Sequence, residues 1–525
     1  MALLNSTAVL GTVAALVLYF VTTRIAAWNR LRHIPGPPGV GWSKAVWMVP
    51  HQLSGRLCKD LEAVCDKYGP LARIGPEWVV CSDPAELRRI WSVHSGYQRA
   101  PWYNGFRFDP NRDNVITANE NKEHHRLRSQ LLRGYSGKGR ASQDSEQRVI
   151  DEQILKFVGL IERKYLSDPR SGALRPMDMG RSFGYLMQDA TSAVGFGEAF
   201  GYADSDEDSY GVIHALESML LPTAMFALLP SLLALVKTPL AAPFMPRPTD
   251  PRGVGRLLKV IHERVEERYS SADRPGDNIK KKEQQAAAAI RDDALQSFVE
   301  SGLSRDEVEA EALVFLLGGA DTTATAIRNT IFYLTTNPAA YRTLQAEIDA
   351  AMGEPARAVA RPVIADQQAK SLPFLQACIR EGLRMWPPIS GLFGKVSDRD
   401  DVICGRKVPA GTYVAWAALG AMKNRHVFGE DADVFEPRRW VEAEPERLRG
   451  MEATQGLVFA AGTRWECLGK RLAYMELGKV LFELFLRFDF AMVKPTQPLE
   501  WQNYGLTIHK NMNVRITRRG SVLCV

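Results

Sequence analysis

Residues 459–469 of the chain, FAAGTRWECLG, decide how the rest of the sequence is interpreted. Cys467 stands just before a stretch with helical apolar spacing that begins at Leu472. A cysteine placed there meets unpaired N–H groups and the positive end of the helix dipole, and both favour the thiolate. Gly462 and Gly469 let the backbone approach a bulky flat ligand. A thiolate placed here could ligate the metal of such a ligand, but taken alone a cysteine of this kind is more often a structural buried residue.

A second informative segment is a long helix with polar residues at its centre. A capping box of the S-x-x-E type begins at Ser304, and Asn337-Pro338 ends the run, so the spacing predicts a helix roughly 45–50 Å long. Its centre, residues 317–323, reads LGGADTT. Two adjacent glycines inside a helix cost about 1 kcal/mol each, which favours close approach of a flat cofactor over a kinked core helix. Asp321 and Thr322 would then deliver protons to dioxygen.

A third segment, residues 372–388, contains Glu381 and Arg384 three positions apart on one helix face. An exposed pair of this kind contributes under about 1 kcal/mol. This helix, however, is flanked by apolar residues and ends in Pro-Pro, and it precedes residues 435–440, FEPRRW.

Taken together, these segments resemble the cytochrome P-450 superfamily. Residues 459–469 are similar to its haem-binding loop F-x-x-G-x-R-x-C-x-G, residues 318–322 to its A/G-G-x-D/E-T groove, and residues 381–384 to its E-x-x-R motif. The loop departs at one point, because two residues rather than one separate Arg464 from Cys467. The resemblance runs from Pro35 to the C-terminus. It implies a mainly α-helical P-450 fold with a small β subdomain that carries haem b.

The resemblance also implies roles for single residues. Cys467 would be the metal ligand, Asp321 and Thr322 the catalytic pair, and the other residues that bind the cofactor would be Phe459, Gly462, Arg464, His124, Arg128, Lys395 and Gly319. Whether Arg464 reaches a haem propionate stays open, since the extra residue before the cysteine could turn it away. Glu381, Arg384 and Arg439 would form a buried network that supports the haem loop.

The activity that the resemblance implies is insertion of one oxygen atom from O2 into a hydrophobic organic substrate. Residues 465–470, WECLGK, resemble members from filamentous fungi that act in specialised-metabolite pathways. The chain stops soon after Cys467 without a flavin domain, so we expect electrons from NADPH through a separate cytochrome P-450 reductase. The candidate docking residues are Arg126, Arg128, Arg133, Lys470 and Arg471. Two alternatives remain: a reductase-independent haem-thiolate isomerase or dehydratase, and a non-catalytic haem protein that binds a ligand.

The N-terminus reads as a membrane anchor. Residues 1–23 carry no charged side chain, and Arg24, Arg30 and Arg32 follow. A helix of this length would span roughly 35 Å, enough to cross a bilayer. The arginines place the rest of the chain in the cytosol by the positive-inside rule, which predicts a single-pass protein of the endoplasmic reticulum membrane. A cleaved signal peptide is the alternative. We therefore expect an anchor over residues 1–23, a basic Pro/Gly-rich linker over 24–40 and a haem domain over 41–525.

Composition adds exclusions and a few local expectations. The net charge of +6 over 525 residues does not indicate nucleic-acid binding, and seven cysteines without a CxxC pair make a disulfide framework or zinc ribbon unlikely. Strands are expected near residues 71–80 and 413–418, and a polar surface loop at 270–285. The apolar segment at 219–244 is expected to be either core or a partly exposed flap that touches the membrane or gates a pocket. The candidate substrate contacts are Trp102, Tyr103, Phe106, Phe108, Phe315, Ala320, residues 390–393 and residues 504–506.

Overall fold

The computed structural model describes residues 2–107, 112–137, 143–236, 238–239, 246–247, 249–272, 293–352 and 361–520. Its α-helices are α1 Ala2–Arg30, α2 Met48–Leu53, α3 Leu57–Tyr68, α4 Pro84–Trp91, α5 Asn121–Ser136, α6 Gln143–Leu160, α7 Met179–Phe196, α8 Tyr202–Ser205, α9 Val212–Leu228, α10 Pro230–Val236, α11 Gly253–Ala272, α13 Ala294–Glu300, α14 Arg305–Thr336, α15 Pro338–Met352, α16 Asp366–Lys370, α17 Pro373–Met385, α18 Ala418–Met422, α19 Arg425–Phe428, α20 Arg439–Glu442, α21 Pro445–Gln455 and α22 Lys470–Arg487. The strands are β1 Leu71–Arg73, β2 Trp78–Cys81, β3 Tyr97–Arg99, β4 Met177–Asp178, β5 Ile389–Ser390, β6 Lys395–Ser397, β7 Asp401–Ile403, β8 Arg406–Val408, β9 Tyr413–Trp416, β10 Phe488–Met492, β11 Glu500–Asn503, β12 Gly505–Lys510 and β13 Asn513–Arg518.

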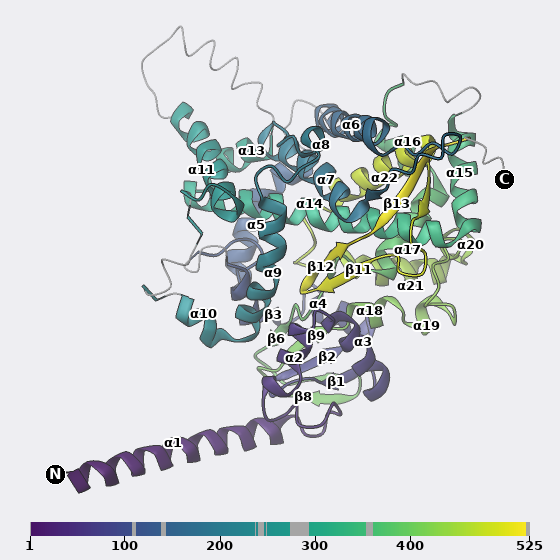
Figure 1. Cartoon of the computed structure of the whole chain (residues 1–525). Coiled ribbons are helices and arrows are strands. Elements are labelled where there is room, and N and C mark those ends of the chain that lie inside the picture. The colour runs from purple at the N-terminus through teal and green to yellow at the C-terminus, as the bar shows by residue number, and fades with distance from the viewer. Residues whose placement is uncertain are drawn as a thin grey trace.

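The long helix α14 runs through the centre of the helical part of the molecule (Figure 1). It starts as the sequence predicts, because the Ser304 N–H donates to Glu307 Oε2 at 2.8 Å while the Glu307 N–H donates to Ser304 Oγ at 3.4 Å. It packs against α7, α17, α11 and α22. By length and apolarity α14 could span a membrane, but 67% of its most apolar window is buried inside the domain, so it is a core helix.

Strands form a smaller part of the fold. The largest sheet has the order β1-β2-β9-β6-β3, in which β2 and β9 run parallel with Trp78 beside Tyr413. The strands expected near residues 71–80 and 413–418 are therefore confirmed. Two three-stranded sheets, β10-β13-β4 and β11-β12-β5, and the hairpin β7-β8 complete the β structure of the described residues. Figure 1 shows the large sheet in a lobe next to the base of α1.

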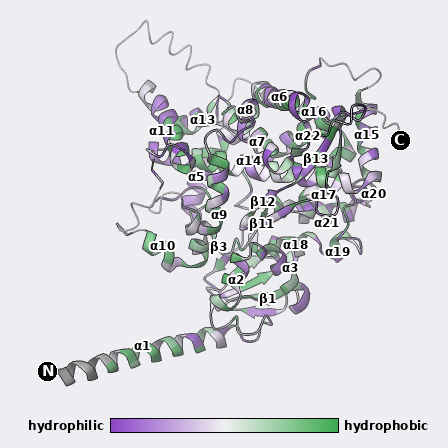
Figure 2. Cartoon of the chain, viewed as in Figure 1, coloured by the Kyte–Doolittle hydropathy of each residue, from purple (hydrophilic) through white to green (hydrophobic). Residues whose placement is uncertain are grey.

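The N-terminal helix leaves the domain as a single rod (Figure 1), and Figure 2 shows hydrophobic residues along much of it. No part of the most apolar window of Leu10–Arg30 is buried, which fits a single-pass membrane anchor. The helix continues to Arg30, so the residues after Thr23 that we expected to begin a linker extend the rod instead.

Some expected segments fall partly outside the described residues. Phe108 and residues 273–285 of the expected polar loop lie outside, as do residues 237 and 240–244 of the apolar segment. The described part of that segment forms α9 and α10, which meet at 114°. Leu232 and Leu235 on α10 are exposed, whereas Leu228 at the end of α9 is buried. The segment is thus core at one end and surface at the other.

Candidate functional site

A cavity of about 300 Å³, measured as the space open to the centre of a water molecule, lies between α14 and the loop that leads into α22. Apolar residues make up most of its wall, and a thiol, a hydroxyl pair and several basic groups interrupt them. Its lining includes Trp91, Arg99, Tyr103, Val115, Ile116, His124, Arg128, Tyr135, Thr191, Val314, Phe315, Gly318, Gly319, Thr322, Thr323, Phe393, Lys395, Trp416, Phe459, Trp465, Cys467, Gly469 and Glu476.

Cys467 lies on the cavity wall directly before α22. Its N–H donates to the Phe459 carbonyl at 2.8 Å, which closes the loop onto itself. The thiol has exposed surface because it faces the cavity rather than the outside of the domain. Burial raises the pKa of Cys467, while the N–H groups of Gly469 and Lys470 and the charge of Arg128 lower it. The helix-end effects thus act in the expected direction, but burial outweighs them; a bound metal cation would shift the balance to the thiolate.

Basic groups gather at one end of the cavity without anionic partners. Arg99 on β3 and Lys395 on β6 are direct cross-strand neighbours, and both are buried. Like charges in this position repel each other. Neither these two nor Arg128 forms an ion pair within the part of the chain that the structure describes. Burial, followed by the charges of Arg99 and Arg128, lowers the pKa of His124 to about 2.

This cluster fits the carboxylates of a haem. A buried charge is stable only when it is paired, and the buried Arg99 and Lys395, with the half-buried Arg128, leave room for an anionic group in the cavity. The Arg99 Nε atom is buried with no hydrogen-bond partner among the described residues. Burial lowers the pKa of Arg99 to about 10, and burial together with Arg99 lowers that of Lys395 well below its usual value. The described residues contain no group of three or more His, Cys, Asp or Glu side chains that could hold a metal ion by themselves.

The extra residue in the loop changes which side chain faces the cavity. Arg464 donates to the carbonyls of Val93 and Ser95, the latter at 3.2 Å, and does not belong to the cavity lining. Trp465 takes the place on the wall, with the Lys395 ammonium 4.4 Å from its ring centroid. Gly462, with φ of 72°, shapes the loop but also lies off the lining. Phe459 lies on the lining as expected.

On the opposite wall, α14 presents the predicted glycines and threonine. Thr322 Oγ1 donates to the Gly318 carbonyl at 2.7 Å, and both residues line the cavity. A Cβ atom on Gly318 would meet nothing within 4 Å, whereas one on Gly319 would lie 2.9 Å from Thr191 Cγ2 of α7. The missing side chain of Gly318 therefore adds open space to the cavity, and that of Gly319 chiefly allows α14 and α7 to pack closely.

Asp321 faces away from the cavity. Its Oδ1 accepts a hydrogen bond from Arg328 Nη2 at 3.3 Å, and it is not among the lining residues. Burial raises the pKa of Asp321, while the charge of Arg328 lowers it. Burial, followed by the charge of nearby Asp321, raises the pKa of Glu217 on α9. The carboxylate thus lies behind Thr322, on the side of α14 that faces α9.

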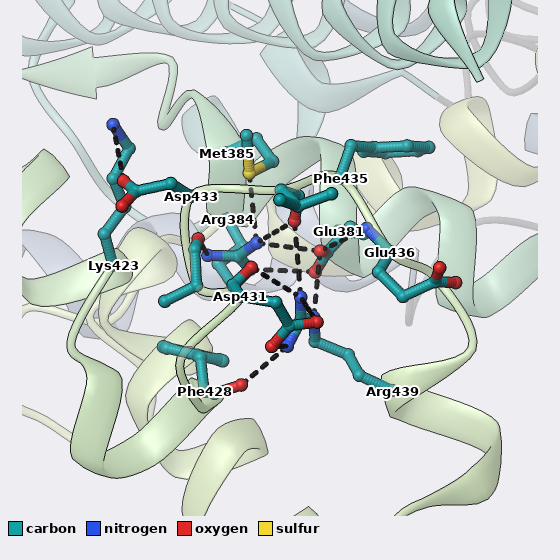
Figure 3. Close-up of polar contacts among 12 residues, drawn as sticks. Glu381, Arg384, Met385, Lys423, Phe428, Asp431, Asp433, Phe435, Glu436 and Arg439 are labelled. Carbon is teal, nitrogen blue, oxygen red and sulfur yellow. Dashed lines mark hydrogen bonds and ion pairs between the residues drawn. The ribbon is translucent and has the colours of Figure 1, made fainter.

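The predicted ionic network supports the site from the other side of α17 (Figure 3). Glu381 accepts from Arg384 at 2.7 and 2.8 Å and from Arg439 at 3.0 Å, and all three side chains are buried. Arg384 also donates to the Met422 carbonyl at 2.8 Å, and Arg439 pairs with Asp431 at 3.0 Å. The prediction of this network is confirmed. It ties α17 to the segment 422–440 that precedes the loop at residues 459–469.

Several expected substrate contacts reach the cavity and others support it. Tyr103, Phe315 and Phe393 line the cavity. Trp102 and Phe106 stand behind, with ring centroids 5.0 and 6.1 Å from that of Phe393. The lining also includes residues for which the sequence offers no signal, chiefly Arg99, Trp91 and Thr191, because no motif marks them and only the sheet and α7 bring them to the cavity.

The basic residues that were expected to dock a partner already interact with other groups of the same chain. Arg126 pairs with Glu123 and Glu307, Arg133 with Glu300, Lys470 with Glu466 and Arg471 with Glu146. Arg128 is directed inward and donates to the Glu466 carbonyl. An acidic partner would have to compete with these carboxylates.

Comparisons with known proteins agree with this geometry. The family described as Cytochrome P450 matches residues 35–514. The chain is 35% identical over 518 residues to "Cytochrome P450 monooxygenase ABA1" of Pyricularia oryzae, covering 97% of this chain and 96% of the relative. It is 33% identical to "Cytochrome P450 monooxygenase aba1" of Botryotinia fuckeliana (93% and 92% covered) and 30% identical to "Cytochrome P450 monooxygenase abl1" of Leptosphaeria maculans (95% and 85% covered). With its long central helix, its cavity thiol and these relatives, the chain belongs to the cytochrome P450 family and is a cytochrome P450 monooxygenase.

Proposed function

We propose that the protein is a membrane-anchored monooxygenase that holds haem b through Cys467 and oxidises a hydrophobic small molecule with electrons from NADPH. The observation that carries the proposal is the placement of one thiol and three basic side chains around a single cavity, where these basic groups form no ion pair with any described residue. Cys467 would ligate the iron, and Arg99, Arg128 and Lys395 would bind the propionates. A haem with a thiolate ligand supplies dioxygen activation and O–O bond cleavage when bound.

The residues of α14 would supply protons. Thr322 reaches the cavity and its hydroxyl is held by the Gly318 carbonyl, so it would be placed to pass a proton to an oxygen acceptor bound in the cavity. Asp321 lies one residue away beside Arg328, on the far side of the helix. We infer that Asp321 takes protons from that side and that Thr322 delivers them, with a water molecule needed between the two.

The substrate is proposed to be apolar. Val314, Phe315, Ile116 and Phe393 contribute to the wall, and such side chains bind apolar ligands by excluding water. Because the relatives are fungal monooxygenases, we further propose a role in fungal specialised metabolism. The apolar helix α1 supports anchoring in a membrane, which we propose is that of the endoplasmic reticulum with the domain in the cytosol.

Spectroscopy and turnover test the proposal. Purified protein should show a Soret band, and its ferrous–CO complex should absorb at the position typical of thiolate ligation, whereas Cys467→Ser should lose that band. Product with one added oxygen should form only with NADPH and a cytochrome P-450 reductase. Product formed without a reductase would instead support an isomerase or dehydratase. An intact haem with no NADPH consumption on any candidate substrate would contradict the proposed oxidation.

Docking of the reductase can be tested separately. Arg133, which is half-exposed and pairs with Glu300, is expected to contribute to the contact. Arg133→Glu should slow reduction of the iron without changing the ferrous–CO spectrum. An unchanged reduction rate would remove this residue from the docking face.

A further inference from the structure

The end of α1 is fastened to the catalytic domain by a buried arginine. Arg73 of β1 is 3% exposed and donates from Nη1 to the Trp28 carbonyl and from Nη2 to the Ala27 carbonyl, both at 2.9 Å. Its Nε also donates to the Gly75 carbonyl and its Nη2 to the Pro76 carbonyl, both at 2.9 Å. The last carbonyls of a helix lack partners within the helix and carry its negative dipole end, so a guanidinium is well suited to bind them.

A second attachment lies on the other side of the helix end. The Arg30 guanidinium donates to the carbonyls of Pro409 and Ala410 and to Thr412 Oγ1, the last at 3.3 Å, in the turn before β9. Arg406 of β8 donates to the His33 carbonyl at 3.0 Å. The helix end is therefore held from both β1 and the β8–β9 turn.

The segment that follows the helix is packed against the catalytic domain. Leu31 is 0% exposed and Ile34 is 3% exposed, and both pack in a core cluster with Leu71 and Val79 of the large sheet. The following loop also lies against the arginine: a Cβ atom on Gly41 would come within 2.8 Å of both Arg73 Nη1 and Trp28 Cδ1. Side chains packed this closely leave little room for rotation of the helix relative to the sheet.

Two tryptophans mark the level at which this junction would meet lipid. The rings of Trp28 and Trp42 stack with centroids 6.0 Å apart and an interplanar angle of 17°, and they remain 37% and 45% exposed. Trp28 lies seven residues beyond Val21, roughly 10 Å along the helix, which places it at the outer edge of a headgroup layer that is about 5–8 Å deep on each side of a bilayer. Tryptophan is enriched in that layer because its ring is apolar and its N–H is polar.

We propose that the junction of α1 with the domain is a rigid joint, so that the tilt of α1 sets one orientation of the catalytic domain on the bilayer. The Trp28–Trp42 stack then rests in the headgroup layer of a phospholipid membrane. This inference rests on the proposed membrane anchoring. Its consequence is that the cavity keeps a fixed direction relative to the membrane, instead of being carried on a flexible tether.

Distance measurements on the full-length protein in lipid nanodiscs test the rigid joint. Spin labels are introduced as non-natural amino acids at Ala14 in α1 and at exposed Glu446 in α21, which leaves the cysteines unlabelled. The wild-type protein should give one narrow distance distribution. Arg73→Gln should at least double its width, and Arg30→Gln, an exposed position, serves as the second variant if Arg73→Gln fails to fold. Arg32→Gln is the matched control, because Arg32 is exposed and forms no hydrogen bond or ion pair among the described residues, and it should leave the width unchanged.

The possible outcomes distinguish a failure of the rigid joint from a failure of membrane anchoring. Flotation with phospholipid vesicles tests anchoring alone, and a protein that does not float contradicts the anchoring itself. A protein that floats but gives a broad wild-type distribution, or whose Arg73→Gln and Arg30→Gln variants both stay narrow, overturns only the rigid joint. Fluorescence quenching by lipids brominated close to the headgroup should fall in a Trp28→Phe/Trp42→Phe variant and persist in Trp501→Phe; equal quenching in both would refute the interfacial position.

Discussion

Replacing Glu381 with Gln is expected to destabilise the fold. The substitution hardly changes the shape of the side chain, but it removes a buried negative charge. The carboxylate accepts five hydrogen bonds: two from Arg384, and one each from Arg439, the Trp440 indole and the Glu436 N–H. In Glu381→Gln an NH2 group replaces Oε2 and faces Arg384 Nε and Trp440 Nε1, which are donors 2.8 Å away.

The magnitude follows from those two lost contacts. Both bonds are accepted by the charged carboxylate, and a hydrogen bond to a charged group contributes about 1.5–3 kcal/mol, so the loss is about 3–6 kcal/mol. The two guanidiniums also lose their common anion, and breaking a buried pair costs about 3–5 kcal/mol. We therefore expect the free energy of unfolding to fall by about 3–5 kcal/mol.

Urea unfolding of the full chain in detergent, followed by tryptophan fluorescence, measures this loss. Glu452→Gln is the matched control, since Glu452 pairs with Arg380, the residue next to Glu381, at 2.7 Å but with both side chains partly exposed. Such a pair contributes about 0–1 kcal/mol. Equal unfolding free energies for the two variants would refute the reasoning that burial makes the Glu381 network essential.

Three further outcomes are expected. Lys395→Met should lower the haem-to-protein ratio of purified protein, because a buried cation of the propionate cluster is lost. Thr322→Val should slow substrate oxidation by about 10²–10⁴-fold while Thr336→Val, at the end of the same helix, has no effect. Burial raises the pKa of Glu311 to about 8, so the folded state binds a proton that the unfolded state releases above its ordinary value of 4.5. Stability should therefore decrease from pH 5 to pH 8, and Glu311→Gln should reduce this slope in urea unfolding.

Each of these outcomes has a clear contrary result. A full haem complement in the Lys395 variant would show that the cluster does not bind the cofactor. Equal oxidation rates in the two threonine variants would exclude a proton-delivery role for Thr322. An unchanged pH slope after substitution of Glu311 would assign the slope to other groups.

Local patterns predicted the features that depend on near neighbours in the chain. The capping box at Ser304, the extent of α14 and the contact between Glu381 and Arg384 all involve residues three or four positions apart or a single helix, so their spacing determines them. The apolar N-terminal helix was predictable for the same reason. The position of Cys467 before a helix was equally local, although the resemblance to the family was needed to assign its ligand role.

Tertiary structure alone decided which charges and rings meet. Arg99 and Lys395 become neighbours through the pairing of β3 with β6, and Trp465 rather than Arg464 turns to the cavity because Arg464 finds carbonyl partners after α4. Arg73 reaches the end of α1 across 45 residues of chain. Such contacts depend on how sheets and loops bring together residues that are far apart in the sequence. A guanidinium can donate to carbonyls or carboxylates and can also stack on aromatic rings. The residue type therefore limits the possible contacts, and only the packing selects one.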